Sequence, residues 1–169
     1  MNKALFDFLL PIIFIFHNYE ELKGFGQFKE VYSKFAAGQL KDREAFKYAI
    51  IILSALVAVI FVANYFIAND FLEMACVVII LSVVINAIQH VGLSIFYRKM
   101  LPGVYTSLFL ILPYFILLIL MSPIVQILLR QHFLILLMLA LITLAVSVHV
   151  SLLLGRIFKL FLQILLEWQ

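Results

Sequence analysis

Five apolar runs, each long enough to cross a lipid bilayer as a helix, alternate with short polar segments along this chain. Only a structure that satisfies its own backbone hydrogen bonds can cross a bilayer, and an apolar run of about 20 residues does so as a helix. Hydrophobic residues make up 66% of the chain, against about 45–50% in soluble domains. The predicted spans cover residues 5–21, 46–68, 72–97, 105–121 and 133–154.

This pattern predicts an all-α fold, a polytopic membrane helix bundle built as one transmembrane domain over residues 1–169. Between the first two runs, residues 22–44 interleave basic and aromatic side chains at a spacing typical of an amphipathic helix on the membrane surface. Residues 126–131 are interpreted as a re-entrant or interfacial turn. The apolar run after Arg156 is either a second surface helix or a continuation of the fifth span.

The basic residues are distributed unevenly between the two sides that five spans would define. Residues 22–47, residues 98–104 and the C-terminus share one side, which holds ten of the twelve lysines and arginines. Only Lys3 and Arg130 lie on the other side. Because cytoplasmic loops are enriched in basic residues, the N-terminus is predicted outside and the C-terminus in the cytoplasm. We expect the plasma membrane of a prokaryote, and no segment suggests a nucleic-acid partner.

Ionisable residues cluster at the end of the first span. His17 is followed by Glu20 and Glu21, and a helix places all three on one face. Placing ionisable side chains at the edge of a bilayer costs free energy. We therefore interpret these residues as a functional site whose partners lie on other helices.

Two other spans offer partners at a similar depth. Asn86, Gln89 and His90 lie in the third span, and His149 lies in the fifth. His17, His90 and His149 stand seven residues before Gly24, Tyr97 and Arg156, respectively, so each lies about 10 Å inside its helix end. Spans one, three and five end on the same side, so the three imidazoles are predicted to converge.

Imidazole and carboxylate groups together suit a divalent metal such as zinc, iron or manganese. The expected ligands are His17, Glu21 or Glu20, His90 and His149. The second glutamate is then a candidate general base acting on a metal-bound water, and Asn86 a candidate to orient a ligand or bind a substrate oxygen. Without a metal, the same residues are suited to proton transfer.

Each part of this set also has a structural interpretation. The acidic residues could form a solvated helix end at the lipid headgroups, and Asn86 with His90 could hold helices together by hydrogen bonds. His149 is more typical of packing than of ligation.

Three short motifs in order resemble a known family. His17-x-x-Glu20-Glu21, Asn86-x-x-x-His90 and Pro102-Gly103 resemble the HxxEE, NxxxH and YxPG motifs of the membrane proteins named for HXXEE. The resemblance covers about residues 10–115, with Met100 where the third motif has tyrosine. It implies a multi-span membrane protein with a polar site, and it implies no reaction.

Three functions remain open from the residues alone. The first is an intramembrane, metal-dependent enzyme, such as a hydrolase, isomerase or oxidoreductase, that acts on a membrane lipid or another hydrophobic small molecule. The second is a proton or cation carrier, which would use the same carboxylates as transport sites. The third is a non-catalytic accessory subunit in which the polar residues join helices.

Overall fold

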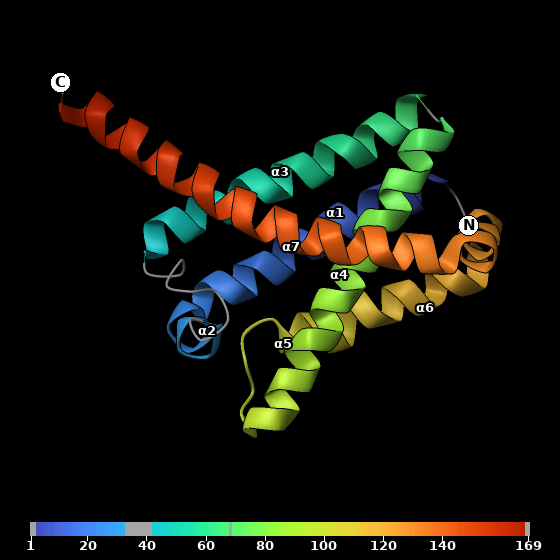
Figure 1. Ribbon diagram of the computed structural model, residues 1–169, viewed down its shortest axis with the longest axis horizontal. Helices are drawn as coiled ribbons and strands as arrows, with labels where there is room; N and C mark the ends of the chain where they lie inside the picture. Colours follow the sequence, from blue (N-terminus) through green and yellow to red (C-terminus); the bar gives the residue numbers. More distant parts are fainter. Residues whose placement is uncertain (1–2, 33–41, 68, 168–169) are drawn as a thin grey trace.

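The computed structural model describes residues 3–32, 42–67 and 69–167, and within these ranges the chain is helical and contains no strand. The elements are α1 (Lys3–Lys23), α2 (Phe25–Tyr32), α3 (Arg43–Ile67), α4 (Asp70–Tyr97), α5 (Val104–Thr106), the π-helix η1 (Ser107–Ile111), α6 (Leu112–Met121) and α7 (Pro123–Glu167). Figure 1 shows α7 lying across α3 and α4, with its C-terminal end projecting beyond the other helices. The predicted all-α bundle is confirmed.

Four of the described helical segments are long and apolar enough to cross a membrane, which makes the chain a membrane protein. They cover residues 43–67, 70–97, 104–121 and 125–167. The sequence predicted five such segments, and α1 is the one that does not qualify. Charged residues bound its apolar stretch, with Asp7 on one side and Glu20 and Glu21 on the other, so the stretch is too short. α1 nevertheless belongs to the bundle, because it packs against α3.

The segment from Val104 to Met121 forms one continuous rod with a π-helical interruption. Pro113 has no N–H group, so the carbonyl of Phe109 lacks its usual α-helical donor. The helix widens just before this point, and the N–H of Leu112 donates to the carbonyl of Ser107, five residues back. The proline predicted within the fourth span therefore changes the helix type without ending the helix.

α7 is longer than the fifth predicted span on both sides. Residues 126–131 are helical, so the predicted interfacial turn is wrong. The break comes at His132, whose φ of −129° and ψ of 21° kink the helix. The apolar C-terminal run continues α7 and does not form a separate helix. Of the predicted surface helix over residues 22–44, α2 provides residues 25–32, and residues 33–41 lie outside the described residues.

The end of α4 turns the chain back toward the bundle. Arg98 adopts a left-handed conformation with φ of 52°, and the N–H of Lys99 donates to the carbonyl of Ser94 (3.1 Å). The Ser94 hydroxyl then accepts from the N–H of Leu101, also at 3.1 Å. Pro102 and Gly103 follow, and α5 begins beside the C-terminal ends of α1 and α4.

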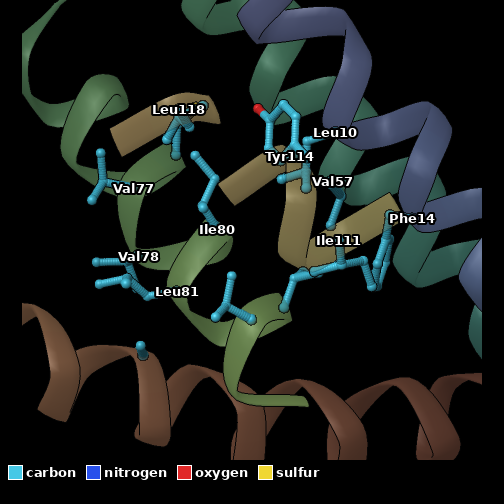
Figure 2. Close-up of a cluster of buried hydrophobic side chains, with 14 of the residues drawn as sticks. Leu10, Phe14, Val57, Val77, Val78, Ile80, Leu81, Ile111, Tyr114 and Leu118 are labelled. Atoms are coloured by element: carbon cyan, nitrogen blue, oxygen red, sulfur yellow. The ribbon is translucent and has the colours of Figure 1, made fainter. Parts of the chain in front are cut away.

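The main apolar core lies between α1, α3, α4 and the η1–α6 rod. In Figure 2, Leu10 and Phe14 of α1 face Val57 of α3 and Ile111 of η1. Ile80 of α4 enters the same cluster. Lipid is as apolar as these side chains, so close packing, more than removal from water, stabilises such a bundle.

Small residues allow α7 to approach α3 closely near the C-terminal half of α7. A Cβ atom at Gly155 would lie 2.2 Å from the carbonyl oxygen of Ala45 and 3.0 Å from the Ala49 side chain. An ion pair between Lys159 and Asp42, at 2.5 Å, lies next to this crossing. Only glycine permits the close approach of α7 to α3 at Gly155. This contact holds α3 and α7 together at the end of the bundle where the C-terminal part of α1 lies.

Candidate metal centre

The last turns of α1 and the C-terminal part of α4 bring three ionisable side chains together. His17 and Glu21 are four residues apart on α1 and share a face, as the sequence predicted. His90 reaches them from α4. The Nε2 atom of His90 lies 2.8 Å from Oε1 of Glu21, and Nε2 of His17 lies 3.3 Å from the same oxygen.

The three side chains form a compact and buried group. One ligand atom from each of His17, Glu21 and His90 lies within 4.8 Å of the others. Both imidazoles are fully buried, and Glu21 is 7% exposed. The imidazole rings stand edge to face, with centroids 5.0 Å apart and planes at 82°. Two imidazoles and one carboxylate around a common point form a donor set used by catalytic zinc and by non-haem iron.

Asn86 flanks this group from α4. Its Nδ2 atom lies 3.0 Å from Nε2 of His17, so its amide sits at the side of the cluster where the ligand atoms point. The predicted convergence of Asn86, His90 and the α1 motif is therefore present in the structure. The amide is half-buried and can offer one more hydrogen bond to a molecule bound there.

Glu20 faces a different direction from Glu21. Its Oε2 accepts hydrogen bonds from the backbone N–H (2.9 Å) and the hydroxyl (2.7 Å) of Thr106, and its Oε1 accepts from the backbone N–H of Tyr105 (3.2 Å). The hydroxyl of Thr106 in turn lies 2.8 Å from Nδ1 of His17. Glu20 thus binds the start of the α5–η1–α6 rod and is linked to the cluster through Thr106.

The structure does not bring His149 to this group. Its imidazole is exposed on α7, and its Nδ1 lies 2.7 Å from the carbonyl oxygen of Ala145 on the same helix. Gln89 is also exposed. The equal spacing of the three histidines from the ends of their helices predicted the same depth in the membrane for all three. Whether they meet also depends on how each helix is rotated about its axis, and the spacing does not determine that rotation.

The Pro102–Gly103 turn closes the centre at the end of the bundle. Gly103 has φ of +89°, and a Cβ atom there would lie 2.8 Å from Cε1 of His90 and 3.0 Å from Cε1 of His17. Pro102 packs against Gly24, where a Cβ atom would clash with the proline ring. Both glycines are therefore required by close approach, and the turn holds the two imidazoles from one side.

A shallow cavity of about 450 Å³ adjoins the centre. Glu20 lines this cavity and also accepts a hydrogen bond from Thr106. The other lining residues are Lys23, Gly24, Gly26, Gln27, Met100, Leu101, Pro102 and Tyr105.

Comparison with known proteins agrees with the motifs. The model of a family described as "protein of unknown function with HXXEE motif" matches residues 8–118, about two thirds of the chain. The chain belongs to the HXXEE family. The resemblance drawn from three short motifs is thus confirmed, and the matched region contains all three residues of the centre. No curated protein and no solved structure matches the chain.

The HXXEE motif also has contacts that sequence reasoning missed. Thr106 joins His17 to Glu20, yet a single threonine after a Pro-Gly pair carries no recognisable pattern. Asn18, inside the motif, donates to the hydroxyl of Ser54 on α3 at 2.8 Å. Its position next to His17 was the one available signal, because a buried polar residue beside a site residue requires a partner.

Proposed function

We propose that this HXXEE protein is an intramembrane enzyme that binds a divalent metal ion at His17, Glu21 and His90 and acts on a lipid or another hydrophobic molecule. The observation that supports it is the convergence of these three side chains, within 4.8 Å and buried, from two helices. Burying a carboxylate and two imidazoles in a membrane bundle costs free energy, and a metal ion that binds all three would offset this cost.

The donor set fits zinc, iron or manganese, and it leaves coordination positions open. A bound ion of this kind supplies a Lewis acid and an activated water molecule. Asn86 is placed beside the ligand atoms, so its amide would orient a substrate oxygen next to the metal. Glu21 and the two imidazoles would hold the ion, and the Pro102–Gly103 turn would exclude bulk water from that side.

The substrate class follows from the surroundings of the centre. The described helices expose large apolar side chains around the bundle, among them Ile88, Phe96 and Phe109 on α4 and η1, as expected for lipid contact. A hydrophobic molecule dissolved in the bilayer would therefore reach the centre laterally between helices. We propose that the centre lies near the cytoplasmic leaflet of a prokaryotic plasma membrane, because the basic segments gather at this end. We further propose that α1, which packs against α3, crosses the membrane as a fifth helix, which places the N-terminus outside.

Metal analysis of purified protein tests this proposal. The protein is purified in detergent after growth with zinc, iron and manganese supplied, and its metal content is measured by mass spectrometry. We expect close to one ion per chain in wild type and a loss of the ion in His17→Ala, Glu21→Gln and His90→Ala. The matched control is His149→Ala, which removes an exposed imidazole and should retain the ion.

Two results would contradict the proposal. One is a folded wild-type protein that holds no metal under any of these conditions. The other is unchanged metal content in Glu21→Gln, which would place the ion elsewhere. If the variants lose only thermal stability and the wild type holds no metal, the cluster serves to join α1 to α4. Metal-free protein that conducts protons or cations in liposomes would instead be a carrier.

A further inference from the structure

A chain of hydrogen bonds leads from the metal centre to the first glutamate of the HXXEE motif. Nδ1 of His17 lies 2.8 Å from Oγ1 of Thr106, and the same hydroxyl lies 2.7 Å from Oε2 of Glu20. The three residues come from α1 and α5, and His17 is fully buried.

Thr106 determines which groups donate and which accept along this chain of hydrogen bonds. A hydroxyl has one proton to donate, and its oxygen can accept other hydrogen bonds. Oε2 of Glu20 already accepts the backbone N–H of Thr106 at 2.9 Å, so this oxygen acts as an acceptor. The carbonyl of Gly103 lies farther from the hydroxyl, at 3.2 Å. Thr106 therefore donates its proton to Glu20, and its oxygen accepts a proton from Nδ1 of His17.

The opposite side of the imidazole agrees with this assignment. A neutral imidazole carries one N–H, so a proton on Nδ1 leaves a lone pair on Nε2. Nε2 of His17 lies 3.0 Å from Nδ2 of Asn86, which is a hydrogen-bond donor. Thr106 on one side and Asn86 on the other thus favour the same tautomer, and they do so against Oε1 of Glu21, which lies 3.3 Å from the same Nε2 atom and would favour a proton there.

We propose that Glu20 is a positioning residue that acts through Thr106 to hold His17 in the Nδ1–H tautomer. Both oxygens of Glu20 are engaged by donors from Tyr105 and Thr106, which leaves this carboxylate badly placed to accept a proton from a substrate. The first glutamate of the motif therefore has a different role from Glu21, whose Oε1 lies against both imidazoles.

The tautomer matters because it leaves a lone pair on Nε2 of His17, the atom that would bind a metal ion held between Glu21 and His90. Metal-binding histidines generally donate their other ring N–H to a carboxylate, a carbonyl or water, which fixes the orientation of the ring. Here a threonine hydroxyl relays that bond to a carboxylate. This consequence for metal binding rests on the proposed function, whereas the tautomer itself is a property of the metal-free protein.

Solid-state NMR can read the tautomer directly. The full chain is labelled with ¹³C,¹⁵N-histidine, treated with a chelator and placed in liposomes at about pH 8. The signals of His17 are assigned by their loss in His17→Gln. We expect the proton on Nδ1 in wild type and in Thr106→Ser, which keeps the hydroxyl.

Two variants test the relay itself. In Glu20→Gln the side-chain amide can donate to Thr106, which frees the hydroxyl proton for Nδ1 of His17. In Thr106→Val the hydroxyl is absent. We expect the ratio of the Nδ1–H to the Nε2–H form to fall about tenfold in both, the size of one charge-assisted hydrogen bond.

Wild-type His17 protonated on Nε2, or an unchanged ratio in Glu20→Gln, would overturn the inference. The wild-type spectrum and Glu20→Gln decide the matter even if Thr106→Val does not fold. Because the measurement is made without metal, its failure is distinguishable from failure of the metal proposal. A protein with the expected tautomer that binds no metal would support the relay and contradict the metal centre.

Discussion

Nε2 of His90 on α4 lies 2.8 Å from Oε1 of Glu21 on α1, and both side chains are buried. This contact links the two helices that build the candidate centre. Removing one partner of a buried pair leaves the other without its interaction, whereas replacing both by apolar side chains can be close to neutral. The pair is therefore suited to a double-mutant cycle.

We expect His90→Leu alone to lower the free energy of unfolding by about 3 kcal/mol, because Glu21 stays buried with one partner fewer. The double variant Glu21→Leu, His90→Leu should recover a large part of that loss. Unfolding in mixed micelles measures both values. Strictly additive losses in the double variant would show that the two side chains do not interact.

Gly103→Ala should disrupt the centre. Its backbone has φ of +89°, and the new Cβ atom would press on both imidazoles. Backbone strain and overpacking each cost about 1–3 kcal/mol, so a thermal shift in detergent should be large. Gly92→Ala is the matched control, since nothing lies within 4 Å of its Cβ position and alanine favours a helix. Equal melting temperatures for the two variants would contradict the packing described for Gly103.

Asn86→Leu should weaken metal binding without removing a ligand. The amide lies 3.0 Å from Nε2 of His17, and loss of such a supporting group lowers metal affinity by about 10–100-fold. Gln89→Leu changes an exposed amide on the same helix and should leave affinity unchanged. Titration of chelator-treated protein with zinc measures both, and similar affinities for the two variants would argue against a role for Asn86.

The ion pair between α7 and the start of α3 should make stability depend on acidic pH. The hydrogen bond from Lys159 holds the pKa of Asp42 below its ordinary value. A lowered folded-state pKa contributes stability above the ordinary aspartate pKa of about 3.9, and this contribution is lost as pH falls through the folded value. Both side chains are partly exposed, so solvent screening limits the effect to about 1 kcal/mol or less.

Asp42→Asn isolates that contribution. The variant should melt slightly below wild type at about pH 7, and the two curves should converge as the pH is lowered below about 4. A difference in melting temperature that is constant over this range would show that Asp42 acts by some means other than its charge.

Much of the fold could be predicted from the sequence because apolar runs and their breaks are local signals. α3 and α4 match their predicted spans within a few residues, and Asn69 begins α4 by accepting from the N–H of Leu72 at 2.8 Å. The long α7 was predicted less well. Its kink at His132 has no proline or glycine to mark it, and nothing local ends its helix after Gly155.

The candidate site was predicted where helical spacing determined it. His17 with Glu21, and Asn86 with His90, are four residues apart, so their shared faces follow from the helix. The choice of His90 and not His149 as the second imidazole depends on how α4 and α7 are rotated, and this depends on packing across the whole bundle. The role of Thr106 depends on the Pro102–Gly103 turn, whose geometry arises from contacts with Gly24 and both imidazoles.

Anomalous scattering from crystals grown with zinc tests the metal centre most directly. Data collected on both sides of the zinc absorption edge should show one peak at about 2.0–2.2 Å from Nε2 of His17, Nε2 of His90 and Oε1 of Glu21. Crystals that contain zinc but show no peak among these three atoms, or that hold the ion at other residues, would contradict the account.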